Sequence, residues 1–301
     1  MSDADPMPLI AGIEAGGTKY VCAVATDPAE PLRETRFPTR DPESTLKQAV
    51  DFFQEASEDF GPIRAVGVGT FGPAEIHPKS PDYGSILTTP KQGWAGFNVV
   101  QALRDGLGTS IPTIFETDVN AAAIGEAEFG AAVNLRYVAY ITVGTGIGAA
   151  FLHDGDLIHG HMHPEVGHMM IPDYDHPYGK KTNVCRFHDS CFEGRASGPA
   201  IEARWGTPGS KLPEDHEAWD LQATYLAAGC VSLTASWSPD LIILGGGVLQ
   251  HPKLIAKVRQ EFERLAGNYW NLPPLNDYLK VPGLGQQAGI VGSLALGKRL
   301  L

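Results

Sequence analysis

The amino-acid sequence predicts an α/β protein built from two related halves. Apolar strand patterns alternate with helical patterns along the chain, which is typical of α/β folds. Two stretches, one near the start and one in the middle, share the same order of strand, Gly/Thr turn and strand. With 301 residues, 43% of them hydrophobic, the chain is long enough for two domains with substantial cores.

The two strand-turn-strand stretches predict a binding site for phosphate groups. They comprise Leu9–Ile13, Glu14–Lys19 and Tyr20–Ala25, and then Tyr137–Val143, Gly144–Gly146 and Ile147–Leu152. Glycines in such turns let backbone N–H groups approach an anion, and a threonine hydroxyl adds a donor. Single glycine turns between strands are common and most bind nothing. The pair of them indicates a phosphate chain held between two related halves.

The first half continues with alternating helices and strands. We expect a helix at Ser44–Ala56, a buried strand at Ile63–Val68, an irregular loop over 73–98, a strand at Thr113–Thr117 and a helix at Asn120–Glu128. The segment Gly67–Gly72 matches a dinucleotide-binding pattern by letter. Because Pro73 and a polar loop follow it instead of a helix, it does not predict that site.

The second half begins with the second hairpin and a stretch rich in His and Pro. We expect helices near Pro199–Trp205 and Trp219–Trp237, and then a strand at Leu241–Leu244 that ends in three glycines. That glycine turn lies at the carboxyl end of a strand, where α/β sheets bind ligands. A final helix over Ala288–Leu301 is expected to pack back on the first domain.

Composition excludes several classes of function. The net charge of −12 and the lack of a basic run argue against a nucleic-acid partner. No segment has the apolar length that a membrane span needs, and Met1–Pro8 is too short and acidic for a secretion signal. The expected location is the cytoplasm. Cys22 and Cys230 lie in apolar surroundings and are interpreted as buried thiols.

Five motifs in order resemble those of the ROK family of bacterial sugar kinases, repressors and related proteins. They are Glu14–Lys19, Asp118–Ala123, Gly144–Gly148, Pro164–His168 and Leu244–Val248, and the resemblance covers roughly residues 9 to 300. It implies the two-domain, actin-like (ribonuclease-H-like) ATPase fold. The implied boundaries are 1–118 for the N-terminal domain and 119–287 for the C-terminal domain, with the helix 288–301 returning to the first.

Within that family the chain looks like the zinc-containing fructokinases. The cues are Gly12–Lys19, Gly69–Pro73, Thr88–Lys91 and Cys185–Pro199. ROK glucokinases carry a segment of the form C-x-C-G-x-x-G-C, which this chain lacks. The difference favours fructose over glucose, and the resemblance implies phosphorylation of fructose to fructose 6-phosphate by ATP with Mg²⁺, in a homodimer.

The resemblance also implies roles for individual residues. Asp118 would be the general base, although an aspartate here could instead cap the following helix. Asn98, Asp118, Glu165 and Glu193 would bind the sugar, and Glu14 would hold Mg²⁺ through water. The ATP phosphates would contact Gly16, Gly17, Thr18, Lys19, Gly144 and Thr145. The adenosine would border Ser197, Gly198, Pro199, Gly245, Gly246 and Gly247.

A C-x-x-H-x-x-C segment and one distant histidine predict a zinc site. Cys185, His188, Cys191 and His168 supply two thiolates and two imidazoles, a closed tetrahedral set typical of structural zinc. The resemblance favours His168 as the fourth ligand over His161, His163 and His176. The site would brace the loop that carries Glu165.

Two other functions stay open at this point. A ROK hexokinase for glucose, mannose or an N-acetylhexosamine would keep the mechanism and change the sugar. A sugar-sensing ROK regulator would normally carry an N-terminal DNA-binding domain, whereas here the first phosphate turn appears by Gly16 and the charge is acidic.

Overall fold

The computed structural model describes residues 7–89, 91–174 and 182–301 and divides into two compact units. The first unit comprises the chain up to Gly130 together with Gln286–Leu301, and the second comprises Ala131–Gly285. The sequence predicts a second domain that begins at residue 119, whereas helix α3 (Asp118–Phe129) belongs to the first unit. The reason is packing, since α3 lies against α9 (Ala288–Lys298). None of the described helices has the length and apolarity to cross a bilayer.

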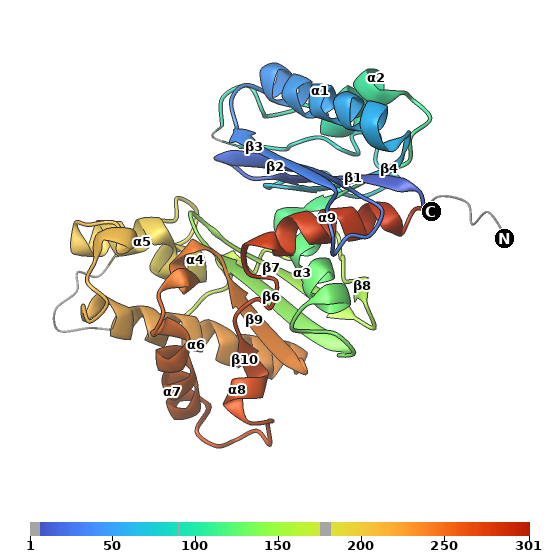
Figure 1. Ribbon diagram of the computed structural model, residues 1–301. Coiled ribbons are helices and arrows are strands. Elements are labelled where there is room, and N and C mark those ends of the chain that lie inside the picture. Colours follow the sequence, from blue (N-terminus) through green and yellow to red (C-terminus); the bar gives the residue numbers. More distant parts are fainter. Residues whose placement is uncertain (1–6, 90, 175–181) are drawn as a thin grey trace. The chain divides into compact units, whose positions relative to one another are not determined.

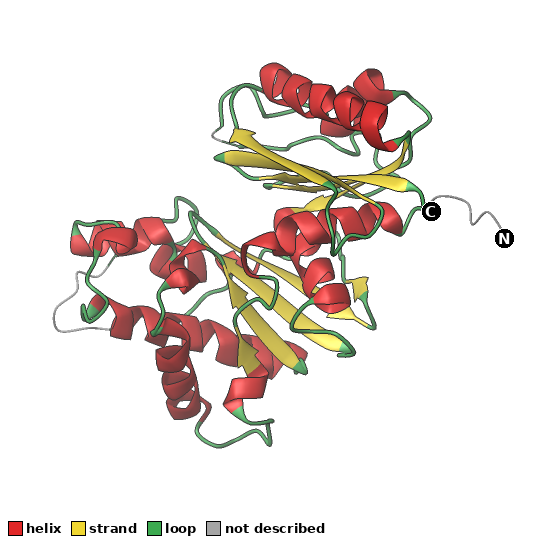
Figure 2. Ribbon diagram, viewed as in Figure 1, coloured by secondary structure: helices red, strands yellow, loops and turns green. Residues whose placement is uncertain are grey.

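The first unit is a five-stranded sheet with helices on both faces (Figures 1 and 2). Its strand order is β3-β2-β1-β4-β5, in which β1, β4 and β5 run parallel and β2 and β3 are antiparallel to their neighbours. The strands are β1 (Leu9–Ala15), β2 (Lys19–Ala25), β3 (Arg33–Pro38), β4 (Ile63–Thr70) and β5 (Thr113–Thr117). One face carries α1 (Pro42–Phe60) and α2 (Val99–Leu107), and the other carries α3 and α9.

The C-terminal helix α9 fits closely onto this sheet because small residues line the contact. A Cβ on Gly12 would lie 2.8 Å from Leu294 Cγ, and one on Gly67 would lie 2.6 Å from the backbone nitrogen of Gly297. The hydroxyl of Ser293 donates to the carbonyl of Ile13 at 2.8 Å. Helix α9 therefore packs against the central strands β1 and β4, although it lies far from them in the sequence.

The second unit repeats the topology of the first. Its order is β10-β9-β6-β7-β8, with β9 and β10 parallel to β6 and the hairpin partner β7 antiparallel to it. The two hairpins that the sequence identified, β1-β2 and β6-β7, thus occupy equivalent places. The strands are β6 (Tyr137–Val143), β7 (Ile147–His153), β8 (Asp156–Leu157), β9 (Leu241–Gly245) and β10 (Leu279–Lys280).

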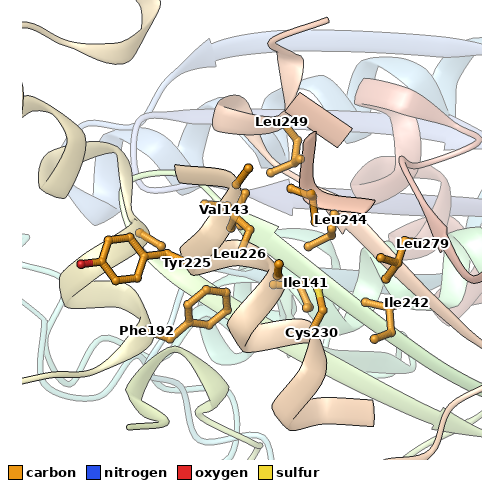
Figure 3. Close-up of a cluster of buried hydrophobic side chains, with 14 of the residues drawn as sticks. Ile141, Val143, Phe192, Tyr225, Leu226, Cys230, Ile242, Leu244, Leu249 and Leu279 are labelled. Carbon is orange, nitrogen blue, oxygen red and sulfur yellow. The ribbon is translucent and has the colours of Figure 1, made fainter. Parts of the chain in front are cut away.

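Helices cover one face of this second sheet and form its core. The α-helices are α4 (Phe192–Ala196), α5 (Gly198–Trp205), α6 (Ala218–Trp237), α7 (Leu254–Ala266) and α8 (Leu275–Tyr278), and short 3₁₀ turns η1 (Val166–His168), η2 (Gly209–Lys211) and η3 (Gly247–Gln250) connect them. Figure 3 shows side chains of α6 and α4, such as Tyr225, Leu226 and Phe192, beside those of β6 and β9, such as Ile141 and Leu244. The α/β prediction, with two domains of actin-like topology, is confirmed.

Candidate active site

In the first unit, three parallel strands end side by side. Ala15 of β1 pairs with Thr70 of β4, which pairs with Thr117 of β5. The residues that follow are Gly16, Phe71 and Asp118, so the phosphate turn and the candidate base leave the same edge of one sheet. Neighbouring strands lie about 4.8 Å apart, which separates the backbones of Gly16 and Asp118 by about 10 Å.

The turn after β1 presents backbone N–H groups to solvent. It is closed by a hydrogen bond from Gly16 N to the carbonyl of Lys19 at 2.9 Å. Thr39, just after β3, braces it, since its hydroxyl donates to Gly16 O at 2.7 Å and its N–H donates to Thr18 O at 2.9 Å. Over the residues that the structure describes, the N–H groups of Gly17 and Thr18 have no acceptor. Sequence reasoning missed Thr39, because no local pattern links it to a turn that lies so far back along the chain.

Gly17 is open on the side where a side chain would project. A Cβ there would meet nothing within 4 Å, and its φ lies outside the left-handed region. The fold itself therefore accommodates other residues at this position. A glycine here leaves the backbone of the turn accessible from that side. Gly16 differs, because its Cβ would lie 2.9 Å from Lys19 O. Lys19 begins β2 with an exposed side chain.

Asp118 stands at the start of α3 but does not cap it. Thr117 is the N-cap, and its hydroxyl accepts from Asn120 N at 3.2 Å. The N-cap position that the alternative interpretation gave to Asp118 is thus occupied by Thr117. The carboxylate of Asp118 is half-buried, and its Oδ1 accepts from Val119 N at 2.8 Å.

Asn98 has a structural role that the sequence did not predict. It is the N-cap of α2, where Oδ1 accepts from Gln101 N at 2.8 Å. Its amide nitrogen donates to Tyr83 O at 2.9 Å and to Ser85 Oγ at 3.1 Å. Both N–H groups of the amide are thus in use, and Oδ1 is the atom that could still accept from a sugar hydroxyl.

The second unit builds an equivalent turn after β6. Gly144 N donates to Gly146 O at 2.9 Å, and Gly144 O accepts from Gly198 N at 2.8 Å, which ties the turn to the start of α5. A Cβ on Gly144 would meet nothing within 4 Å. In the described part of the chain, the N–H groups of Thr145 and Gly146 have no acceptor.

The glycines after β9 divide into two kinds. Gly246 has φ +89° and a Cβ on it would overlap the backbone of Val143, so the fold requires glycine there. Gly245 is also confined, since a Cβ on it would lie 2.5 Å from the hydroxyl oxygen of Tyr140. A Cβ on Gly247, in contrast, would meet nothing within 4 Å. Of the three, only Gly247 has the open surroundings of Gly17 and Gly144.

Ser197 supplies a buried polar atom beside this edge. Its side chain is fully buried, and among the described residues its Oγ has no hydrogen-bond partner. Gly198 and the exposed Pro199 form the first turn of α5 directly after it. Because buried hydroxyls are nearly always paired, Ser197 Oγ marks a place for a polar ligand or a water molecule.

Glu193 and Glu165 lie near the second turn. The Glu193 carboxylate accepts from Ile147 N at 2.9 Å, which fastens α4 to the start of β7. Glu165 Oε1 lies 3.7 Å from His163 Nδ1. Burial raises the pKa of Glu165; His168 lowers it and the Glu193 carboxylate raises it further. The two carboxylates therefore share one region of the second unit.

Four potential metal ligands converge in the same region. The ligand atoms of His168, Cys185, His188 and Cys191 all lie within 4.8 Å of one another. Cys185 Sγ is 3.8 Å from His168 Nδ1 and 3.5 Å from His188 Nδ1, and Cys191 Sγ is 3.8 Å from His168 Nδ1. A tetrahedral zinc ion with ordinary bond lengths requires about 3.6 Å between sulfur and nitrogen ligands. The donor set and its spacing fit zinc.

One backbone N–H group donates to each of the two cysteine sulfur atoms of this cluster. Phe187 N donates to Cys185 Sγ at 3.4 Å, and Gly194 N donates to Cys191 Sγ at 3.3 Å, with Cys191 as the N-cap of α4. Such donors stabilise metal-bound thiolates. Of the competing histidines, His161 is exposed, His163 is buried beside Glu165, and His176 lies outside the described residues, as does Pro90 of the Thr88–Lys91 motif.

Comparisons with known proteins indicate the family of the chain. The model of the ROK family matches residues 10–299. The chain is 39% identical to a putative fructokinase of Bacillus subtilis, over 97% of this chain and 96% of that one. It is 38% identical to a fructokinase of Pediococcus pentosaceus, over 97% and 99% respectively. The structure of the ROK hexokinase from Thermus thermophilus superposes with a TM-score of 0.79 at 26% identity, over 97% and 98% of the two chains.

Proposed function

Since the chain belongs to the ROK family, we propose that it is an ATP-dependent fructokinase that converts D-fructose to fructose 6-phosphate. The observation that carries the proposal is the shared strand edge of the first unit, where an anion-binding turn and Asp118 follow neighbouring strands. Phosphoryl transfer needs a fixed phosphate and a positioned base, and this edge offers both.

Asp118 acts as the general base. Its carboxylate accepts the proton of the fructose 6-hydroxyl while the oxygen attacks the γ-phosphorus and ADP departs. This role is supported by Thr117, because Thr117 is the N-cap of α3 and Asp118 is not needed in that position. General-base catalysis contributes about 10²- to 10⁴-fold. We therefore expect Asp118→Asn to lower kcat by at least about 100-fold, with the unfolding midpoint close to that of the wild type.

The phosphate turns bind the nucleotide. Gly16, Gly17, Thr18 and Lys19 in the first unit, and Gly144 and Thr145 in the second, supply N–H groups, hydroxyls and one ammonium group to the phosphates. The open surroundings of Gly17 and Gly144 support this role. Ser197, Gly198 and Pro199, with Gly245, Gly246 and Gly247, border the adenosine, as the unpaired buried hydroxyl of Ser197 suggests.

Sugar hydroxyls are bound by carboxylate and amide oxygens. Asp118 and Asn98 Oδ1 contribute from the first unit, and Glu165 and Glu193 contribute from the second. Glu193 already accepts from Ile147 N, so one of its oxygens also fixes the β7 start. That bond supports a role for Glu193 in holding the turn as well as in contacting sugar.

Two metals complete the proposal. Zinc would be held by His168, Cys185, His188 and Cys191 in a structural role, because two thiolates and two imidazoles make a closed ligand set. It would connect η1, which follows Glu165, to the N-terminus of α4, which carries Glu193. Mg²⁺ accompanies ATP and neutralises its phosphates. Glu14, near the end of β1, would hold it through water; burial raises the pKa of Glu14, and a nearby cation would offset that effect.

We further propose a homodimer that acts in the cytoplasm, where ATP is supplied and zinc thiolates stay reduced. Light scattering on the purified chain tests the dimer.

A coupled assay of ADP release tests the activity. Fructose, mannose, glucose and N-acetylmannosamine are compared with Mg-ATP, each with wild type and Asp118→Asn, and zinc content is measured by atomic emission. Fructose should give the highest kcat/KM, with one zinc ion per chain. Rapid turnover of glucose without turnover of fructose would overturn the substrate, and unchanged stability after removal of zinc would overturn the structural metal.

A further inference from the structure

Lys91 stands at the same strand edge as the phosphate turn, and the proposed nucleotide and sugar sites do not include it. Its ammonium nitrogen donates to the carbonyl oxygen of Gly17, the residue at the open tip of the turn. The same nitrogen lies 6.0 Å from the centre of the Phe71 ring, within range of a cation–π interaction. Gly17 follows β1 and Phe71 follows β4, so Lys91 contacts the ends of two of the three neighbouring strands.

The backbone around Lys91 is fixed by a buried tryptophan. Trp94 is fully buried, its Nε1 donates to Arg40 O at 2.8 Å, and its N–H donates to Lys91 O at 3.2 Å. Its ring lies 5.3 Å from that of Phe71 and 5.8 Å from that of Tyr20. The side chain of Lys91 thus starts from a rigid point, although it lies in the irregular loop over 73–98.

The charge of Lys91 is not neutralised by a carboxylate. The ion pairs within the described residues do not include Lys91, and the one hydrogen-bond partner of its ammonium nitrogen is the carbonyl oxygen of Gly17. An ammonium group has three N–H donors, and the Gly17 carbonyl takes one. Two N–H donors of the ammonium group therefore remain available next to this turn. A positive charge next to backbone donors is suited to an oxyanion with more than one oxygen to offer.

We propose that Lys91 is a catalytic residue that binds the γ-phosphoryl group of ATP and stays with it during transfer. The inference rests on the proposed function, since it requires the phosphates to bind at the turn after β1. Phe71 lies between Gly16 and Asp118 at the strand edge, because Phe71 N donates to Ala15 O at 2.7 Å and Thr70 pairs with Thr117. The ammonium group over Phe71 therefore lies on the way from the turn to the base.

The chemistry balances without a proton from Lys91. The bond from the sugar oxygen to the γ-phosphorus forms, the bond from that phosphorus to the bridging oxygen breaks, and the hydroxyl proton passes to Asp118. Negative charge on the transferring group is spread over its oxygens, and Lys91 stabilises it there. Removing one such donor costs about 10²- to 10³-fold in kcat in well-studied enzymes.

The test compares Lys91→Met, Lys91→Arg and the control Lys79→Met, whose exposed side chain lies in the same loop. Steady-state kinetics give kcat and KM, and calorimetry gives the affinities for ADP and for AMPPNP, which retains a third phosphate. Lys91→Met should lower kcat by about 10²- to 10³-fold and weaken AMPPNP at least about 10-fold while ADP changes less than about 3-fold. Lys91→Arg should recover part of both losses, and Lys79→Met should match the wild type.

Three outcomes overturn the inference. One is a kcat for Lys91→Met within about 3-fold of the wild type. Another is an equal loss of ADP and AMPPNP affinity, which would indicate that Lys91 only holds the turn. The third is a rise in the KM for fructose alone, which would place Lys91 on the sugar. If wild type itself fails to phosphorylate fructose, or Gly17→Ala leaves nucleotide affinity unchanged, the proposed function fails instead.

Discussion

Gly246→Ala is expected to destabilise the second unit strongly. With φ +89° and ψ 173°, Gly246 occupies a backbone region that is open almost only to glycine, and a side chain there costs about 1–3 kcal/mol. The new Cβ would also lie 2.5 Å from Val143 N and 2.7 Å from Val143 C, and such overpacking costs about 1–3 kcal/mol more. The total is about 2–6 kcal/mol, because backbone and not a flexible side chain must move.

The adjacent glycine gives a matched control. A Cβ on Gly247 would meet nothing within 4 Å, so Gly247→Ala should change the free energy of unfolding by less than about 1 kcal/mol. Urea denaturation without ligands measures both variants, and calorimetry should show a Tm lower by at least about 4 °C for Gly246→Ala. Unfolding free energies within about 1 kcal/mol of each other would refute the reasoning.

Three further changes probe the turn, the metal cluster and the anchor of the loop. Gly17→Ala should raise the KM for ATP at least about 10-fold without a change in Tm, because its methyl group would occupy open space that a phosphate needs; unchanged ATP kinetics would contradict this. In metal-free native protein at about pH 8, iodoacetamide should alkylate the half-buried Cys185 before the buried Cys230, because burial raises the pKa of the Cys230 thiol to about 12. Peptide mass spectrometry measures the order of labelling, and labelling of Cys230 first would contradict the prediction. Trp94→Ala should cost about 3–5 kcal/mol in urea denaturation, as a fully buried ring is lost, and a cost below about 1 kcal/mol would count against its anchoring role.

Much of the fold could be predicted from sequence because its signals are local. Each hairpin places apolar residues on both sides of a glycine turn, so strand type and turn position follow from short stretches. Helix ends were harder. The first helix begins at Pro42, since Asp41 caps it by accepting from Ser44 N at 2.9 Å, whereas the sequence pattern placed its start at Ser44.

The parts that sequence could not supply depend on contacts between distant segments. Asp118 was open to interpretation as a helix cap until Thr117 was seen in that place. The bond from Thr39 to the phosphate turn joins the ends of strands β3 and β1, which are not neighbours in the sheet, and no spacing in the sequence encodes it. The sequence showed Lys91 only as part of the Thr88–Lys91 motif. The role proposed for it depends on the contact of its ammonium group with Gly17, 74 residues earlier in the chain.

The most direct test of the account is to identify the phosphorylated sugar by ³¹P NMR after wild type and Asp118→Asn have each been incubated with fructose and Mg-ATP. We expect wild type to yield fructose 6-phosphate, and Asp118→Asn to form it at least about 100-fold more slowly while it still binds AMPPNP with wild-type affinity. Phosphate on another hydroxyl, or an equal rate for the two proteins, would contradict the assignment of Asp118 as the base that activates the 6-hydroxyl.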